Sequence, residues 1–182
     1  MRHFFFGVMQ YYQALGLEPK LTVDLEDLKK RFYECSRQWH PDRFSRAEAA
    51  QQQQALDMTA LLNDAFRTLR DPVSRAEYFL KQNGMELSKE APPELLEEVF
   101  ELNMILEAVR DGGDPSQLTV SRELFAGMLG DTDASLRALF ESYDSRGDRA
   151  TLREVNDSLS RRRYISNLVR EVDKELNVHT AN

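Results

Sequence analysis

The tripeptide His40-Pro41-Asp42 lies between two amphipathic helical patterns, and no other feature of the sequence constrains the fold as strongly. One apolar stripe precedes it at helical spacing, through Leu25, Leu28, Phe32, Cys35 and Trp39. A longer stripe follows it, through Ala55, Met58, Leu62, Ala65, Phe66 and Leu69. Because proline disfavours helical geometry at the residue before it, the first helix is predicted to stop near the tripeptide. The two stripes therefore predict an antiparallel helical hairpin with His40-Pro41-Asp42 in the loop at its tip.

Capping residues and prolines predict the helix boundaries in this half of the chain. A short first helix is predicted over about residues 12–17. The next helix begins after Asp24, a favourable N-cap, and ends near Trp39. The third runs over about residues 47–70 and stops at Pro72. We expect four side chains to lie in the core, with the cysteine as a small hydrophobe and not a reactive thiol: Phe32, Cys35, Trp39 and Phe66.

The second half of the chain predicts a three-helix bundle. Its first helix covers about residues 94–110, after a pair of prolines. A second segment follows over about residues 114–143, and Gly127 and Gly130 are expected to kink or split it. The last helix covers about residues 148–176. Short loops favour an up-down-up arrangement, so the whole fold is predicted to be all-α.

The helix predicted over residues 94–110 carries two apolar stripes, although one is enough to attach it to a bundle. The first stripe passes through Leu95, Val99, Leu102, Leu106 and Val109. The second passes through Leu96, Phe100 and Met104, with Asn103 beside it. This second stripe is either buried against the first domain or a neighbouring helix of the bundle, as apolar stripes usually are, or a docking surface on which a few apolar anchors bind a partner.

The composition excludes several classes of function. One cysteine and three widely spaced histidines in 182 residues exclude a disulfide framework, and no metal or other cofactor is expected. The net charge of −7 argues against a nucleic-acid partner, which requires clustered cations. No apolar run is long enough to span a bilayer, so no membrane role is expected. The residues offer no nucleophile–base pair, so the protein is not expected to be an enzyme.

Basic residues gather on the helix before the loop and in the loop itself. Between residues 29 and 43 the sequence has five basic residues and only two acidic ones, Glu34 and Asp42. The basic residues are Lys29, Lys30, Arg31, Arg37 and Arg43. Taken alone, such a run is usually a solvated helix face. Beside a rigid loop it favours a positive surface that attracts an acidic partner protein.

These patterns divide the chain into an N-terminal extension at 1–10, the hairpin domain at 11–80, a linker at 81–93 and the bundle at 94–182. The extension is predicted to be disordered or to precede a true start at Met9, because it lacks the marks of a signal or transit peptide. The linker is predicted from Asn83-Gly84 and Pro92-Pro93, which interrupt any helix.

The hairpin domain resembles a J domain, the module that stimulates ATP hydrolysis by DnaK-type chaperones. The resemblance rests on the short first helix, the basic second helix, His40-Pro41-Asp42 and the segment Asn63-Asp64-Ala65-Phe66-Arg67-Thr68-Leu69. It implies that His40, Pro41 and Asp42 dock on the ATPase of the chaperone. The five basic residues named above are expected to belong to the same surface.

A J domain followed by an acidic helical bundle is similar to the HscB family of iron–sulfur cluster co-chaperones. The segment Arg75-Ala76-Glu77-Tyr78-Phe79-Leu80 matches the one that this family carries between its domains. The resemblance implies that the bundle binds an IscU-type cluster scaffold while the J domain stimulates a DnaK/HscA-type chaperone. The implied scaffold-binding positions are Leu96, Phe100, Asn103, Met104, Arg163 and Tyr164. The family often carries a charged residue where this chain has Asn103.

Some eukaryotic members of that family carry a pair of Cys-x-x-Cys motifs, which this sequence lacks. It therefore resembles the bacterial type, and we expect a cytoplasmic protein, rather than one of the mitochondrial matrix, that acts as a monomer. Two alternatives remain from the residues: a J-domain co-chaperone for a different client, and a helical adaptor in which His40-Pro41-Asp42 has no link to a chaperone.

Overall fold

A computed structural model describes residues 10–87, 90 and 92–180, and the regular elements of this described part are all helical. The prediction of an all-α fold is therefore confirmed, whereas the predicted extension lies outside the described residues except for Gln10. The chain forms two compact units, of which the first ends at Glu86 and the second begins at Leu87. The elements are α1 (Gln10–Ala14), α2 (Leu25–Gln38), η1 (Pro41–Phe44), α3 (Ala49–Arg70), α4 (Pro72–Gln82), η2 (Pro93–Leu95), α5 (Leu96–Arg110), α6 (Ser116–Arg146) and α7 (Arg149–Thr180).

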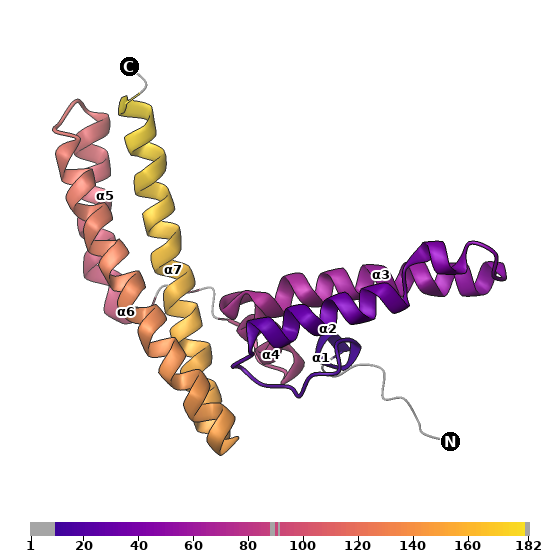
Figure 1. Cartoon of the computed structure of the whole chain (residues 1–182). Helices are drawn as coiled ribbons and strands as arrows, with labels where there is room; N and C mark the ends of the chain where they lie inside the picture. Colours follow the sequence, from indigo (N-terminus) through magenta and orange to yellow (C-terminus); the bar gives the residue numbers. More distant parts are fainter. Residues whose placement is uncertain (1–9, 88–89, 91, 181–182) are drawn as a thin grey trace. The chain divides into compact units, whose positions relative to one another are not determined.

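In the first unit, α2 and α3 lie side by side as the predicted hairpin (Figure 1). The Asp24 carboxylate caps α2, because it accepts hydrogen bonds from the backbone N–H groups of Glu26 and Asp27. Between the helices, the rings of Phe32 and Phe66 stack with their centroids 4.4 Å apart. This pairing fixes the two helices against each other, and the loop at the tip is held by their ends.

Burial along the first stripe differs from the prediction in part. Leu28 is fully buried, but the stripe's first member, Leu25, is 53% exposed. Phe32, Cys35 and Trp39 are half-buried. Burial raises the pKa of the Cys35 thiol, and the Glu34 carboxylate raises it further. A thiol with a raised pKa is a poor nucleophile at neutral pH.

The structure also corrects the helix boundaries of this unit. The first helix begins at Gln10, earlier than predicted, and α3 begins at Ala49. Pro72 does not only end α3: it occupies the first turn of a separate helix, α4, which the sequence reasoning missed. Proline suits that position because its missing N–H has no partner in a first helical turn, and Asp71 caps the helix through the Ser74 N–H.

Helix α4 belongs to the core of the first unit. Its buried residues are Arg75, Ala76, Phe79 and Leu80. Arg75 is an unusual core residue, and its guanidinium donates to the backbone carbonyls of Leu21 at 2.7 Å and Leu69 at 2.6 Å. Burying a charge this deeply is tolerable only when its donors are satisfied. Arg75 thereby ties α4 to the segment before α2 and to the end of α3.

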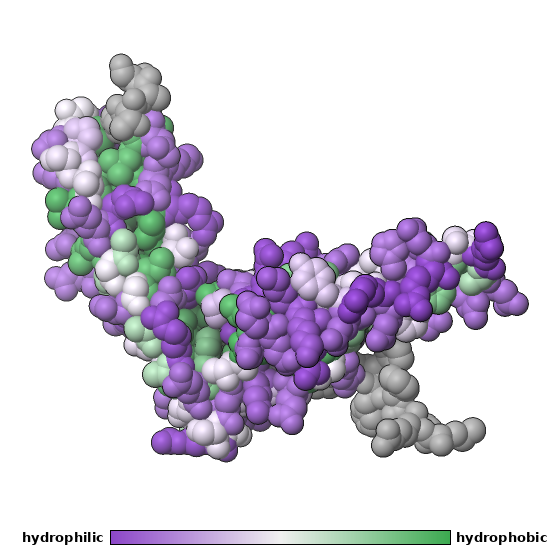
Figure 2. Space-filling model, in the orientation of Figure 1, coloured by the Kyte–Doolittle hydropathy of each residue, from purple (hydrophilic) through white to green (hydrophobic). Residues whose placement is uncertain are grey.

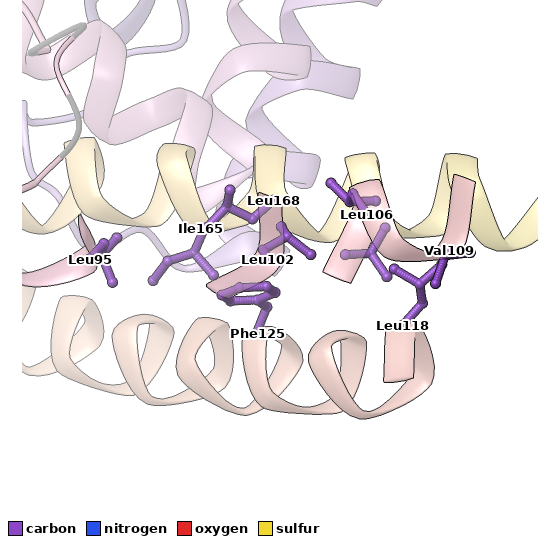
Figure 3. Close-up of a cluster of buried hydrophobic side chains, with 9 residues drawn as sticks. Leu95, Leu102, Leu106, Val109, Leu118, Phe125, Ile165 and Leu168 are labelled. Atoms are coloured by element: carbon purple, nitrogen blue, oxygen red, sulfur yellow. The ribbon is translucent and has the colours of Figure 1, made fainter. Parts of the chain in front are cut away.

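The second unit is a bundle of α5, α6 and α7, as predicted. Their buried side chains converge in one cluster, with the Phe125 ring close to Leu102 (Figure 3). The cluster consists of Leu95, Leu102, Leu106, Val109, Leu118, Phe125, Ile165, Leu168 and Val172. Helix α5 covers only part of the longer pair, and beyond it α6 and α7 continue as a two-helix hairpin.

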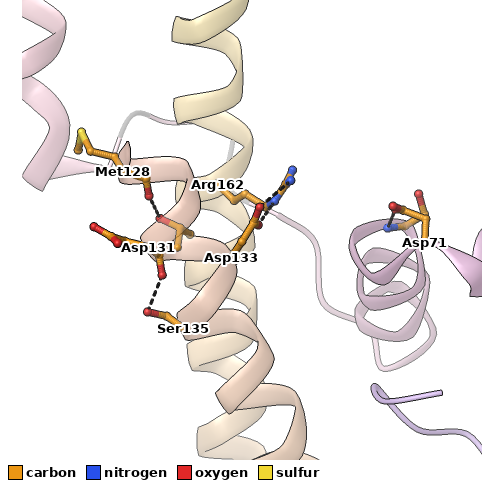
Figure 4. Close-up of polar contacts among 8 residues, drawn as sticks. Asp71, Met128, Asp131, Asp133, Ser135 and Arg162 are labelled. Carbon is orange, nitrogen blue, oxygen red and sulfur yellow. Dashed lines mark hydrogen bonds and ion pairs between the residues drawn. The ribbon is translucent and has the colours of Figure 1, made fainter. Parts of the chain in front are cut away.

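Helix α6 runs without a break from Ser116 to Arg146, so the expected split at Gly127 and Gly130 is wrong. Packing along α7 outweighs the helix propensity that two glycines forfeit, about 1 kcal/mol each. Between the two helices, the Arg162 guanidinium donates to the carboxylate of Asp133 (Figure 4). The hairpin turns at Gly147, whose φ of 68° lies in the left-handed region that glycine adopts at helix ends.

Candidate protein-interaction sites

The loop at the tip of the hairpin forms the first candidate site. His40 has the extended backbone expected before proline, with φ −60° and ψ 127°, and residues 41–44 form one turn of 3-10 helix. The Asp42 N–H donates to His40 Nδ1 at 3.3 Å. Because Nδ1 accepts this bond, the neutral imidazole carries its proton on Nε2, which serves as a donor.

Both polar groups of the loop are accessible. The side chains of His40 and Asp42 are 59% and 90% exposed, and Nδ1 lies 3.6 Å from Asp42 Oδ2. A hydrogen bond within the loop stabilises it, since the Ser45 hydroxyl donates to the Asp42 carbonyl at 2.9 Å. A donor and an acceptor are thus presented on a short, stiff turn, and such a turn loses little entropy when a partner binds.

The basic residues of α2 divide into two groups. Lys29, Lys30 and Arg37 are exposed, as is Arg43 in the loop. Arg31 is instead committed to the fold: its guanidinium donates to the Asp27 carboxylate at 2.7 Å and to the Gly16 carbonyl at 2.6 Å. Hydrophilic residues dominate the visible face of this hairpin (Figure 2).

An exposed aromatic residue lies within this basic surface, and the sequence reasoning missed it. Tyr33 is 57% exposed. It follows Lys29 and precedes Arg37 by four residues each, so all three lie on one face of α2. The signal was available, because Tyr33 falls off the apolar stripe of that helix. Tyrosine is enriched among the residues that dominate binding at protein interfaces.

The second candidate site is the outer stripe of α5. Leu96, Phe100 and Met104 are 56%, 67% and 55% exposed, whereas the inner stripe of the same helix lies in the bundle core. The outer stripe is therefore not part of the core of the second unit. Asn103 is exposed beside it. An exposed patch of leucine, phenylalanine and methionine at helical spacing is typical of a docking surface.

Residues of α7 predicted for the same surface lie in different directions. Tyr164 is half-buried and packs against the bundle cluster to which α5 contributes. Arg163 precedes it by one residue and is therefore turned by about 100° around the helix. Arg161, which the sequence reasoning did not select, pairs with Glu94 at 3.3 Å near the start of α5. Arg161 and Tyr164 are thus among the residues that link α7 to the α5 side of the bundle, as is Glu175, which pairs with Arg110 of α5 at 2.9 Å.

The described part of the chain contains neither a metal site nor a helix suited to a membrane. No group of three or more histidine, cysteine, aspartate or glutamate side chains there is arranged to hold a metal ion. Among the same residues, none of the helices combines the length and the apolar character that crossing a bilayer requires.

The hairpin with its exposed His40-Pro41-Asp42 loop defines a class of protein, the J-domain proteins. The family model of the DnaJ domain matches residues 10–78, which comprise α1 to α3 and most of α4. A second family model, the HSCB C-terminal oligomerisation domain, matches residues 91–173. The chain belongs to the HscB family of co-chaperones, as its relatives also show.

A co-chaperone HscB homolog from Neisseria meningitidis is 36% identical over 115 residues, which are 60% of this chain and 68% of that protein. A homolog from Vibrio campbellii is 28% identical over 173 residues, 91% of this chain and 95% of its own. The structure of HscB from Vibrio cholerae has a TM-score of 0.67 at 28% identity, covering 93% of this chain and 98% of its own. Human HscB has the same fold, with a TM-score of 0.66 at 22% identity, covering 96% of this chain and 92% of its own. The predicted J domain and the HscB resemblance are confirmed.

Proposed function

We propose that this co-chaperone is an adaptor with two binding ends in iron–sulfur cluster assembly. The loop at His40-Pro41-Asp42 and the exposed face of α2 engage the ATPase of a DnaK/HscA-type chaperone. The outer stripe of α5, with Tyr164, binds an IscU-type cluster scaffold. The protein activates the ATPase of its partner and needs no cofactor for this. We further propose a cytoplasmic, monomeric protein, and sedimentation analysis tests the monomer.

The chaperone end is supported by chemistry that suits a polar, acidic partner surface. The loop offers the Nε2–H of His40 as a donor and the carboxylate of Asp42 as an acceptor, 59% and 90% exposed. Lys29, Lys30 and Arg37 add positive charge on the same hairpin. Exposed charges of this kind raise the association rate more than they lower the dissociation rate.

The exposure of Leu96, Phe100 and Met104 is the main support for the proposed scaffold-binding surface. The opposite face of α5 is already buried, so the fold does not require these three apolar side chains. Each exposes more than half of its surface, and removal of that surface from water on binding favours a complex by about 25 cal/mol per Å².

The two ends act together because one chain carries both. A scaffold bound to the bundle is held near the chaperone that binds the J domain, at an effective concentration of up to about millimolar. ATP hydrolysis by the chaperone then traps the scaffold and assists cluster release. In this mechanism the co-chaperone positions its partners and the chemistry takes place on them.

His40→Gln tests the chaperone end. Glutamine keeps a polar side chain of similar length but changes the donor geometry on the turn, so stimulation of the chaperone ATPase should be lost. The fold should survive, because His40 is largely exposed and surface substitutions usually cost less than about 0.5 kcal/mol. Unchanged stimulation with a folded variant would favour the alternative, a helical adaptor without a chaperone link.

The triple change Leu96→Ala, Phe100→Ala and Met104→Ala tests the scaffold end. Loss of three anchors, at about 1–2 kcal/mol each, should weaken scaffold binding by about 100-fold or more in calorimetric titration. Basal ATPase stimulation should remain. A matched control is Val120→Ala with Leu124→Ala, two side chains of α6 that are 68% and 51% exposed and lie outside the proposed surface.

A folded triple variant that binds the scaffold like wild type would contradict the scaffold assignment. Normal stimulation of the chaperone by that variant would then favour the other alternative, a J-domain co-chaperone for a different client. If the triple change instead unfolds the bundle while the α6 control does not, the outer stripe contributes to the fold.

A further inference from the structure

The backbone carbonyl of Trp39, next to His40, has no donor from its own loop. Carbonyl groups in the last turn of a helix lack intrahelical partners, and Trp39 is the C-cap of α2. Two residues on, Pro41 has no N–H to donate. The Asp42 N–H donates to His40 Nδ1, and the Arg43 N–H donates to the His40 carbonyl. The carbonyl at the entrance of the loop therefore depends on a donor from elsewhere.

That donor is a side chain of α3. The hydroxyl of Thr59 lies 3.1 Å from the Trp39 carbonyl oxygen and 2.8 Å from the carbonyl oxygen of Ala55, one turn earlier in its own helix. A threonine hydroxyl has one hydrogen, so the two acceptors share it. Helical threonines commonly donate to the carbonyl four residues before them. The contact with Trp39 is additional and spans 20 residues of sequence.

Trp39 also contacts a residue at the far end of the loop. Its indole stacks on the ring of Phe44, with an interplanar angle of 11° and centroids 5.9 Å apart. Trp39 directly precedes His40, and Phe44 lies two residues after Asp42, so a contact that holds Trp39 also acts on the far end of the loop through the stacked rings. Further along, the Gln52 amide donates to the Ala47 carbonyl at 2.9 Å and steadies the start of α3.

We propose that Thr59 is a positioning residue for the chaperone-docking loop: its hydroxyl, by binding the Trp39 carbonyl, holds the loop in the orientation that the chaperone recognises. Thr59 is half-buried beneath the loop and acts through Trp39, without touching the partner. The proposal rests on the proposed function of the loop. Its physical basis is preorganisation, since a loop already held in its bound conformation loses less entropy on binding.

Three variants separate positioning from general stability. Thr59→Val removes the hydroxyl and keeps the shape of the side chain, whereas Thr59→Ser restores a hydroxyl. Thr132→Val is the matched control, because the Thr132 hydroxyl makes only the helical type of bond, to the Met128 carbonyl at 2.8 Å, far in sequence from the loop. Any general cost of replacing a helical threonine by valine appears in this control as well.

Two measurements on the full chain read the effect. In titrations of the chaperone ATPase, Thr59→Val should raise the co-chaperone concentration for half-maximal stimulation about fivefold, the factor that a hydrogen bond of ~1 kcal/mol represents. Hydrogen exchange at the amides of Asp42 and Arg43 should accelerate in Thr59→Val. Thr59→Ser and Thr132→Val should match wild type in both measurements.

The proposal is overturned if Thr59→Val leaves the half-maximal concentration and the loop amides unchanged, or if Thr59→Ser fails to restore them. His40→Gln, measured alongside, distinguishes this from failure of the proposed function. If His40→Gln abolishes stimulation while Thr59→Val behaves as wild type, only the role of Thr59 is refuted. If His40→Gln stimulates normally, the docking role of the loop is refuted, and amide exchange alone decides whether Thr59 holds the loop.

Discussion

Tyr33 adds an exposed aromatic ring to the basic face of α2. A face made only of Lys29 and Arg37 would attract an acidic partner at long range but would add little affinity once salt screens it. The exposed ring between them offers apolar area that a complex would bury. Long-range attraction would then come from Lys29 and Arg37, and affinity within the complex from Tyr33.

Tyr33→Ala should therefore weaken chaperone engagement. Loss of an aromatic side chain that contributes about 1.4 kcal/mol of binding free energy should raise the concentration for half-maximal ATPase stimulation about tenfold. Salt titration gives the second reading: the dependence on ionic strength should persist, because the basic residues remain. Leu56→Ala, a similarly exposed apolar residue on α3, is the control. An unchanged half-maximal concentration in Tyr33→Ala would remove Tyr33 from the docking surface.

Asp148 gives the bundle a pH dependence at the start of α7. The Thr151 N–H and hydroxyl donate to its carboxylate at 2.8 and 2.9 Å, and these bonds lower the pKa of Asp148 below its usual value. A lowered pKa in the folded state means that the cap stabilises the fold above the unfolded-state pKa. The stabilisation is lost as the pH falls through the folded-state pKa.

Asp148→Ala should consequently lower the melting temperature at neutral pH, and the difference from wild type should disappear in strongly acidic buffer. Thermal melts followed by circular dichroism at both pH values check this. Asp157→Ala, at an exposed position within α7, should show neither effect. A melting difference that stays constant on acidification would mean that the carboxylate charge at Asp148 does not stabilise the cap.

At the scale of elements, the sequence predicted the helices whose pattern is strongest. The two stripes of α5 were separable from spacing alone, because Leu95 and Leu102 differ from Leu96 and Phe100 by their angle around the helix. Which stripe faces the core depends on neighbouring helices, and no local pattern contains that information. Exposure of Leu96 and Phe100 therefore had to come from the structure.

The elements that prediction missed have identifiable causes. Pro72 is a stop signal for the helix before it, but a proline directly after Asp71 also marks a helix start, and this second signal corresponds to α4. The split expected in α6 gave too much weight to Gly127 and Gly130. Both are exposed, and the helix continues through them because its core side chains pack on either side. Tertiary packing thus overrode local propensity.

The buried stripe of α5 should be essential to the bundle and not to the J domain. Leu102 is 1% exposed, and Leu102→Ala should destabilise the second unit by about 2–5 kcal/mol. The protein contains one tryptophan, Trp39, so its fluorescence reports unfolding of the first unit. In urea, the circular dichroism transition of the bundle should move to lower denaturant while the Trp39 transition stays in place. Leu96→Ala, on the outer stripe, should move neither, and a coincident shift of both signals in Leu102→Ala would show that the units unfold together.

At the scale of the whole molecule, the two proposed surfaces belong to two units, each with its own hydrophobic core. The first unit owes its stability to the pairing of α2 with α3 and the buried α4, and the second to the cluster of α5, α6 and α7. The charge follows the same division: residues 1–80 hold equal numbers of acidic and basic residues, so the net charge of −7 lies in the remainder. The two proposed surfaces therefore lie on units that differ in net charge.

If tethering is the function, the two surfaces must belong to one chain. The folded His40→Gln variant keeps the scaffold surface, and the α5 triple alanine variant keeps the docking loop. A mixture of the two should raise chaperone ATPase activity at low scaffold concentration no more than the sum of their separate effects. The wild-type chain should exceed that sum by roughly tenfold or more, because the linked surfaces gain from effective concentration. At saturating scaffold the advantage should shrink, since free scaffold then reaches the chaperone without a tether. A chain carrying both sets of substitutions gives the background, and a mixture as active as wild type would mean that the two ends act independently.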